Sequence, residues 1–384
     1  MRFEFATAAR IVFGPGTLTE AGPMARQFGR HALVVTGRTP ARAEPLVTGL
    51  AQHGVQVTLF SIPGEPSTEM VDHGVAAARQ TGAELVIGFG GGSAIDAGKA
   101  IAAMLTNPGE LLDYLEVVGR GRSLTAAPAP FIAVPTTAGT GAEVTRNAVL
   151  TALAQQVKVS LRSPLLLPQA AIVDPELTCE LPCHITAASG LDALTQLIEP
   201  FVSCRANPMT DALCREGLRR AALALPRVCA QGDNLAARTE MSLVSLWSGM
   251  ALANAGLGAV HGFAGPIGGR FSAPHGAICA ALLPSVMAAN LRALRERAPT
   301  GETLARFDEV ARLLTGNVEA RAEDGVRWVS ALVKDLKIPR LGDYGIAATH
   351  VPELVQKATA ASSMKGNPLP LTAAETSGLL LAAL

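Results

Sequence analysis

The sequence is poor in aromatic residues, poor in charge and balanced between the two signs of charge. Aromatic residues make up 4% and charged residues 17% of 384 positions, and 32 Lys and Arg match 32 Asp and Glu. Nucleic acids and anionic membrane surfaces attract clustered cations, and this chain has no Lys/Arg run. We therefore expect neither a nucleic-acid partner nor a membrane partner.

Three further features are missing: paired cysteines, an N-terminal apolar segment and a long apolar run. No C-x-x-C occurs, the first ten residues hold no signal-peptide core, and no run approaches the roughly 18–20 apolar residues that span a bilayer. We expect a cytoplasmic protein with reduced, mostly buried thiols. The six cysteines are Cys179, Cys183, Cys204, Cys214, Cys229 and Cys279.

The remaining composition favours two domains. The chain is too long for one core, and 49% of it is hydrophobic. Its first part alternates helical patterns with short apolar runs, which predicts a mostly parallel sheet covered on both faces. The later part is alanine-rich and almost entirely helical in pattern. We predict an α/β domain over residues 1–165 and an all-helical domain over 166–384. The expected strands are 11–13, 32–36, 55–61, 85–89, 131–135 and 157–161.

A glycine-rich turn follows the expected strand 85–89, in the stretch ELVIGFGGGSAIDAGK, residues 84–99. Gly90, Gly91 and Gly92 turn the chain, and Ser93 can cap a helix whose first turn holds Asp96. Unpaired N–H groups at a helix start and missing Cβ atoms let a phosphate approach the backbone. The alternative is a tight strand–helix turn without a ligand.

Other loops at the carboxyl ends of the expected strands carry residues suited to a dinucleotide, because ligands of parallel sheets bind there. The segment PTTAGTGAEVT, 135–145, is rich in small hydroxyl residues. Ser67 or Thr68 is a candidate helix cap, and Lys158 could place a cation beside phosphate or ribose. The cofactor-binding candidates are Gly37, Arg38, Ser67, Gly90, Gly91, Gly92, Ser93, Asp96, Thr136, Thr137, Thr140 and Lys158.

Candidate metal ligands lie in the helical part. Asp192, Gln196 and Glu199 share one helix face at i, i+4 and i+7. His261 and His275 lie among small residues further on. An acid and two imidazoles are ligands of a catalytic Zn²⁺ or Fe²⁺ site. Spacing alone favours the alternative of satisfied core histidines.

The whole chain resembles the iron-containing (group III) alcohol dehydrogenases, relatives of glycerol dehydrogenase, maleylacetate reductase and dehydroquinate synthase. The resemblance implies a Rossmann-like dinucleotide domain, an all-α domain of the dehydroquinate synthase type and an active site between them. It implies NAD(P)-dependent hydride transfer on a small alcohol, aldehyde or oxo compound, a homodimer or larger assembly, and Fe or Zn at Asp192, Gln196, His261 and His275. It rests on residues 90–99, 135–145, 173–178, 190–203, 254–262 and 274–276.

Three positions depart from the family pattern. Gln196 replaces a histidine and should weaken metal binding, although Asp192, His261 and His275 can suffice. Gly265 stands where a histidine is suspected of relaying protons. Gly37 and Arg38 stand where an Asp often binds the adenosine ribose, which favours NADP or dual use.

These departures keep other functions open. One is a metal-independent oxo-acid reductase resembling maleylacetate reductase. Another is a lyase of the dehydroquinate synthase type that recycles bound NAD, and a third is a cofactor-binding protein without catalysis.

Overall fold

The computed structural model describes residues 2–155 and 157–384, which divide into two compact units. One unit holds residues 7–137 and 141–179. The other holds the segment up to Ala6, residues 138–140 and residues 180–384. The division at 179/180 lies later than the predicted 165/166, because strand β8 (Ala170–Val173) pairs with β1 and β5 and so belongs to the sheet.

The first unit is built on a six-stranded parallel sheet in the order β1-β8-β5-β4-β2-β3. All pairings described within it are parallel. The strands are β1 (Ile11–Phe13), β2 (His31–Thr36), β3 (Gln56–Ser61), β4 (Leu85–Gly90), β5 (Phe131–Pro135) and β8. The first five confirm expected strands to within one residue at each end. β8 was not expected, because residues 170–173 lie in the part of the chain assigned to the all-helical domain.

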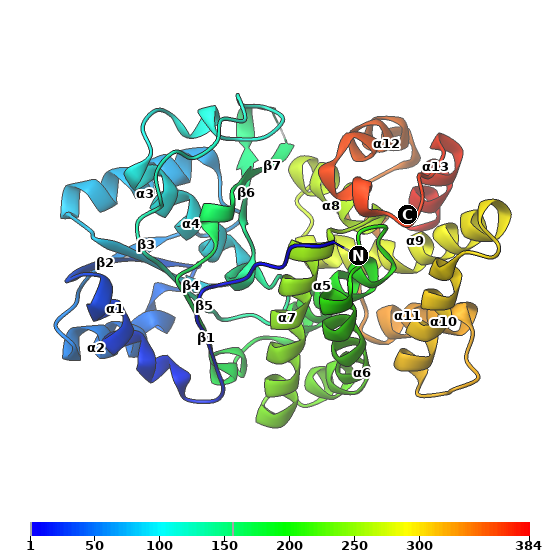
Figure 1. Ribbon diagram of the computed structural model, residues 1–384, viewed down its shortest axis with the longest axis horizontal. Helices are drawn as coiled ribbons and strands as arrows, with labels where there is room; N and C mark the ends of the chain where they lie inside the picture. Colours follow the sequence, from blue (N-terminus) through cyan, green and yellow to red (C-terminus); the bar gives the residue numbers. More distant parts are fainter. Residues whose placement is uncertain (1, 156) are drawn as a thin grey trace. The chain divides into compact units, whose positions relative to one another are not determined.

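Helices cover both faces of this sheet (Figure 1). Ala32 and Val34 of β2 pack with α1 (Ala21–Phe28) and α2 (Glu44–Gln52). The alternating residues Leu33 and Val35 pack with α3 (Thr68–Thr81) and α4 (Gly92–Thr106). Because successive side chains of a strand point to opposite faces, both sets of side chains are buried.

An antiparallel hairpin accompanies the sheet. It joins β6 (Asn147–Ala152) to β7 (Val157–Arg162). β7 confirms the expected strand 157–161, although it lies outside the main sheet. Lys99 of α4 ties the helix to this region: its Nζ donates to the Thr145 and Asn147 carbonyls at 2.8 and 3.0 Å.

The second unit is helical, from α5 (Cys183–Val202) through α13 (Ala373–Ala382). Its core contains Leu194, Leu197 and Phe201 of α5. The helices between are α6 (Pro208–Ala230), α7 (Leu235–Ala255), α8 (Ala259–Arg270), α9 (His275–Arg297), α10 (Glu302–Thr315), α11 (Ala322–Asp335) and α12 (Val351–Ala360).

Helix α9 meets a length-and-composition criterion for a membrane span, although it holds no continuous apolar run of 18 residues. Its mean hydropathy over 18 residues is 1.6, but 72% of that window is buried inside the chain. Ile278, Leu282 and Val286 lie in the helical core. The apolar character of α9 therefore reflects its place in that core.

Candidate metal and cofactor sites

The carboxyl ends of neighbouring strands bring the glycine turn and two other predicted loops together in the first unit. Thr36 pairs with Ser61, and Gly90 pairs with Pro135. A Cβ on Gly90 would lie 2.7 Å from the Ala94 Cβ and 3.4 Å from the Gly37 nitrogen. A glycine at position 90 is thus what allows α4 to start this close to the strand.

The turn itself starts helix α4 two residues earlier than a Ser93 cap predicts. Gly91 is the N-cap and Gly92 the first helical residue, so Ser93 lies inside the first turn and does not cap it. The reason is that Gly91, with no side chain, occupies the narrow position beside Thr137, whose Oγ1 would lie 3.3 Å from a Cβ there. Gly91, Gly92 and Thr137 are partly exposed. The residues predicted to bind phosphate thus lie at one helix N-terminus.

Several other predicted cofactor residues have hydrogen bonds within the protein. Ser67 caps α3 by accepting from the Met70 N–H at 3.2 Å, as expected. Asp96 Oδ2 accepts from the Val149 N–H at 3.0 Å, which ties α4 to the hairpin. Lys158 Nζ lies 3.2 Å from Glu65 Oε1. Arg38 is exposed and donates through Nε to the Pro63 carbonyl at 3.0 Å.

The three predicted threonines are divided between the two units. Thr136 is buried, and its N–H donates to the Gly90 carbonyl at 2.9 Å. Thr136 and Thr137 belong to the sheet unit, whereas Thr140 belongs to the helical unit.

In the helical unit, Asp192, His261 and His275 lie together. Asp192 Oδ1 is 3.3 Å from His261 Nε2 and 3.7 Å from His275 Nε2. Asp192 is on α5, His261 is on α8 and His275 is the first residue of α9. The Asp192 side chain is 2% exposed and that of His275 is 32% exposed. The structure thus assembles the three predicted ligands from three helices.

Glycines allow these helices to approach so closely. A Cβ on Gly276 would lie 2.4 Å from the Ala188 carbonyl oxygen of α5, so only glycine permits the start of α9 to reach that helix. A Cβ on Gly258 would lie 2.8 Å from Glu199 Oε1. The small residues around the histidines therefore serve helix packing.

Glu199 holds His261 in place. Its Oε2 lies 2.7 Å from His261 Nδ1, and its Oε1 accepts from the Val260 N–H at 2.7 Å. The carboxylate thus lies at the positive N-terminus of α8 and fixes the imidazole on its first turn. With the proton on Nδ1, Nε2 presents a lone pair beside Asp192, which is the arrangement of a metal-ligating histidine.

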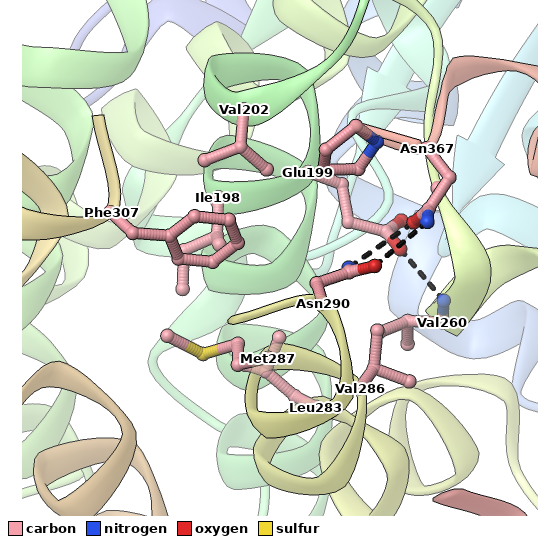
Figure 2. Close-up of a pocket in the computed structure, with 12 residues that line it drawn as sticks. Ile198, Glu199, Val202, Val260, Leu283, Val286, Met287, Asn290, Phe307 and Asn367 are labelled. Atoms are coloured by element: carbon pink, nitrogen blue, oxygen red, sulfur yellow. Dashed lines mark hydrogen bonds between the residues drawn. The ribbon is translucent and has the colours of Figure 1, made fainter. Parts of the chain in front are cut away.

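A small cavity of about 10 Å³ adjoins Glu199, the space of roughly one water molecule. Figure 2 shows its polar end at Glu199, Asn290 and Asn367 and its apolar end at Ile198 and Phe307. Asn367 Oδ1 accepts from the Ala259 N–H at 3.1 Å, so Asn367 also binds the start of α8. The cavity is too small for a substrate.

Both ends of the Gln196 side-chain amide are engaged in hydrogen bonds. Its Nε2 donates to Asp192 Oδ2 at 3.0 Å, and its Oε1 accepts from Ser248 Oγ at 3.0 Å. Asp192 Oδ1, by contrast, is buried without a hydrogen-bond partner among the described residues. A buried carboxylate oxygen without a donor is costly unless a cation satisfies it. This oxygen and the two imidazole nitrogens beside it fit a divalent metal ion.

Electrostatic attraction between the acidic and imidazole side chains of the cluster shifts their pKa values. Burial disfavours the charged form of Asp192, but His275 and His261 outweigh it and hold its pKa below the ordinary value. Burial likewise works against charge on His261, but Cys279, Asp192 and Glu199 raise its pKa well above the ordinary value. The pKa of His275 is raised too, by Cys279 and Asp192 against burial. The carboxylate therefore favours protonated imidazoles when no metal ion is bound. A bound cation would replace the Nε2 protons, and the Nε2 lone pairs would then face the ion.

Cys279 is a member of this cluster that the sequence interpretation missed. Its Sγ lies 3.7 Å from both His261 Nε2 and His275 Nε2. Ligand atoms of Asp192, His261, His275 and Cys279 all lie within 4.8 Å of one another. The spacing of Cys279 four residues after His275, one helical turn, was the available signal. Glu199, though placed on the right face, was given no role, because its partner is distant in sequence.

Fold and site together define a class of protein. A Rossmann-like α/β unit carries a glycine-rich turn suited to binding phosphate, and a helical unit after it carries a buried cluster of side chains that can bind a metal ion. Two family descriptions match the chain: iron-containing alcohol dehydrogenase over residues 8–175, and the C-terminal region of the Fe-containing alcohol dehydrogenase family over residues 186–384. The chain belongs to the iron-containing alcohol dehydrogenase family.

Individual relatives match over almost their whole length. A probable alcohol dehydrogenase EutG of Escherichia coli is 35% identical over 99% of this chain and 94% of its own. The NAD-dependent methanol dehydrogenase of Bacillus methanolicus is 31% identical over 97% of both. The crystal structure of a 1,3-propanediol oxidoreductase covers 100% of both chains with a TM-score of 0.92 and 33% identity.

These findings confirm the predicted family and the predicted fold class. The chain is an oxidoreductase of the alcohol dehydrogenase type, and the family implies NAD(H) and a divalent metal. The relatives support the dehydrogenase hypothesis and give no support to the alternatives of a metal-independent maleylacetate-reductase-like enzyme or a lyase.

Proposed function

We propose that this protein interconverts a small primary alcohol and its aldehyde, using NAD(H) or NADP(H) and a divalent ion bound by Asp192, His261 and His275. One observation carries the metal part of the proposal: Asp192 Oδ1 is buried without a hydrogen-bond donor among the described residues, beside two imidazole nitrogens. The small substrate is inferred from relatives that act on methanol and 1,3-propanediol by name.

The side chains of the helical unit prepare the site. A bound divalent ion supplies a Lewis acid, and a bound nicotinamide supplies the hydride chemistry. Glu199 holds His261 through Nδ1, and Gln196 donates to Asp192 Oδ2 so that Oδ1 faces the two imidazole Nε2 atoms. Helices α5, α8 and α9 keep Asp192 and His261 buried, which strengthens their electrostatic interactions.

The loops of the sheet unit are proposed to bind the dinucleotide. Gly90, Gly91, Gly92 and Ser93 offer the N-terminus of α4 to the pyrophosphate. Thr137 is partly exposed beside that turn. Arg38 uses only Nε for its hydrogen bond to Pro63, so its other donors suit a ribose phosphate. We therefore propose that NADPH is accepted as well as NADH.

The central experiment combines metal analysis of the purified protein with a panel of alcohols and aldehydes, each assayed with NADH and NADPH. We expect about one divalent ion per chain and stoichiometric consumption of the added nucleotide. Turnover without net change in nucleotide absorbance contradicts the dehydrogenase proposal, since a lyase would recycle its cofactor.

The variant His261→Ala tests the role of the cluster. Loss of a Lewis acid removes several kcal/mol of charge stabilisation, so kcat/KM should fall by at least ~1000-fold. His184→Ala, at an exposed position of α5, is the matched control and should leave the rate unchanged. Near-normal turnover of the metal-free His261→Ala protein contradicts metal assistance.

We further propose that the protein acts in the cytoplasm as a homodimer. The support is the resemblance of the whole chain to a family that is commonly dimeric or larger. Light scattering of the purified protein measures the assembly, and cell fractionation measures the location. A monomer, or recovery with membranes, contradicts this part of the proposal.

A further inference from the structure

The cluster around Asp192 contains one more donor than the proposed function uses. Cys279 lies one turn after His275 on α9, and both it and Asp192 are at most 1% exposed. The Cys279 sulfur faces two imidazole nitrogens at 3.7 Å. It therefore lies in the helical core with its sulfur among the three proposed ligands.

The separations of these atoms match the edges of a metal-centred tetrahedron. Zn–N bonds of about 2.0–2.1 Å and a Zn–S bond of about 2.3 Å place neighbouring ligand atoms about 3.3–3.6 Å apart in tetrahedral geometry. The observed separations are 3.3 Å for Asp192 to His261, 3.7 Å for Asp192 to His275 and 3.7 Å from Cys279 to each histidine. Four edges therefore already agree to within a few tenths of an ångström.

Gln196 leaves the fourth position to another residue. Both ends of its amide are in hydrogen bonds, to Asp192 Oδ2 and to Ser248 Oγ. An amide oxygen is also a weaker ligand for Zn²⁺ or Fe²⁺ than an imidazole or a thiolate. The cluster would have three donors if Cys279 did not contribute.

We propose that Cys279 is the fourth protein ligand, which makes the centre an Asp–His–His–Cys site selective for Zn²⁺ over Fe²⁺. The inference rests on the metal site of the proposed function and specifies its ligands. With four protein ligands in place, a substrate oxygen would bind the zinc ion as a fifth ligand, a coordination number that catalytic zinc can reach. Thiolate is a soft ligand, and mixed nitrogen–sulfur tetrahedral sites are characteristic of zinc. On binding, the thiol proton passes to solvent and the sulfur binds as thiolate.

X-ray absorption of the wild-type protein loaded with zinc tests the proposal without any variant. We expect one sulfur neighbour at about 2.3 Å together with nitrogen or oxygen neighbours at about 2.0–2.1 Å. A shell of nitrogen and oxygen alone overturns the assignment of Cys279 and leaves the proposed function intact. Full turnover by protein that retains no metal overturns metal assistance itself, and the inference with it.

Cobalt substitution provides the matched comparison of variants. Wild-type protein loaded with Co²⁺ should show a thiolate-to-cobalt charge-transfer band, and Cys279→Ser should lack it. Cys279→Ser should also bind the ion at least ~10–100-fold more weakly, which is the loss typical even for partners beyond the ligands. Cys204→Ser, at an exposed cysteine, is the control and should keep both band and affinity. A band that persists in Cys279→Ser overturns the proposal.

Discussion

At the scale of single residues, the Glu199 carboxylate makes three different contacts. It binds the start of α8 through Val260, it fixes the proton of His261, and it borders the small cavity. No single one of these contacts is unusual, but together they decide which nitrogen of His261 can bind a metal ion. The carboxylate is therefore a positioning residue.

We predict that Glu199→Gln weakens metal binding by ~10–100-fold. If the Gln carbonyl keeps the hydrogen bond to Val260, its amide donates towards His261 Nδ1 and moves the imidazole proton to Nε2. Titration of the metal-free protein with Zn²⁺ measures the effect. Gln155→Glu, at an exposed position, is the control for added or removed charge. Unchanged affinity would show that the proton position does not depend on Glu199.

A second residue pair concerns stability rather than the site. Lys99 and Glu143 are 1% and 2% exposed. Burial lowers the pKa of Lys99 to about 8 and raises that of Glu143 to about 7. Neither side chain is exposed enough to be solvated in its charged form.

The sign of the pH dependence follows from the direction of the Glu143 shift. Its folded pKa of about 7 exceeds the ordinary value of 4.5, so between these values the folded state binds more protons than the unfolded state. The free energy of unfolding therefore falls as pH rises from about 5 to 7. Glu143→Gln should remove this fall, amounting to about 2–3 kcal/mol.

Denaturant unfolding of both proteins from pH 5 to 8 measures this difference. The variant should gain stability relative to the wild type as pH rises. Two parallel stability curves would mean that Glu143 is charged throughout the range in the folded protein. The lowered pKa of Lys99 acts at higher pH, where stability rises between about 8 and 10.5.

At the scale of elements, glycines decide how closely helices approach. Gly265 in α8 has open space: apart from its chain neighbours and the adjoining backbone of its own helix, no described heavy atom lies within 4 Å of a Cβ built there. Gly276 in α9 has the Ala188 carbonyl oxygen at 2.4 Å. The same substitution should therefore have opposite effects at these two positions.

We predict that Gly265→Ala stabilises the protein by about 0.5–1 kcal/mol, because alanine loses less chain entropy in a helix. Gly276→Ala should destabilise it, because the methyl group forces α9 away from α5, and should lower metal affinity as His275 moves. Thermal unfolding and Zn²⁺ titration measure both effects. Destabilisation by Gly265→Ala would contradict the open space beside that residue.

At the scale of the whole molecule, the two units are proposed to bind different ligands. Hydrogen exchange can separate them, because a ligand that binds only the folded state protects the elements that it contacts. NADH should slow exchange in the turn before α4 and in the loop after β5. Zn²⁺ should slow exchange at the starts of α8 and α9.

Linkage also gives the free energy by which each ligand should stabilise the unit that binds it. A ligand at 100 times its Kd stabilises its unit by about 2.7 kcal/mol. Exchange measured by mass spectrometry with each ligand alone tests the assignment. Protection by NADH that is absent from residues 90–101 would contradict the proposed nucleotide site, whatever the result with zinc.

The sequence by itself determined the elements and the type of chemistry. Short apolar runs bounded by glycine or proline identified β1 to β5, and the i, i+4, i+7 spacing placed Asp192, Gln196 and Glu199 on one face. It missed β8, which is stabilised by pairing with distant strands, and it placed the helix cap at Ser93 where Gly91 serves. Local patterns report local backbone preferences, so these errors fall where long-range contacts decide.

Only the tertiary structure decided which side chains meet. His261 and His275 carry no recognisable ligand spacing, yet packing of α5, α8 and α9 brings both to Asp192 and adds Cys279. It also gave Glu199 and Gln196 their partners, which lie on other helices. Distances between atoms on separate helices depend on how those helices pack, and here glycines at the contacts set that packing.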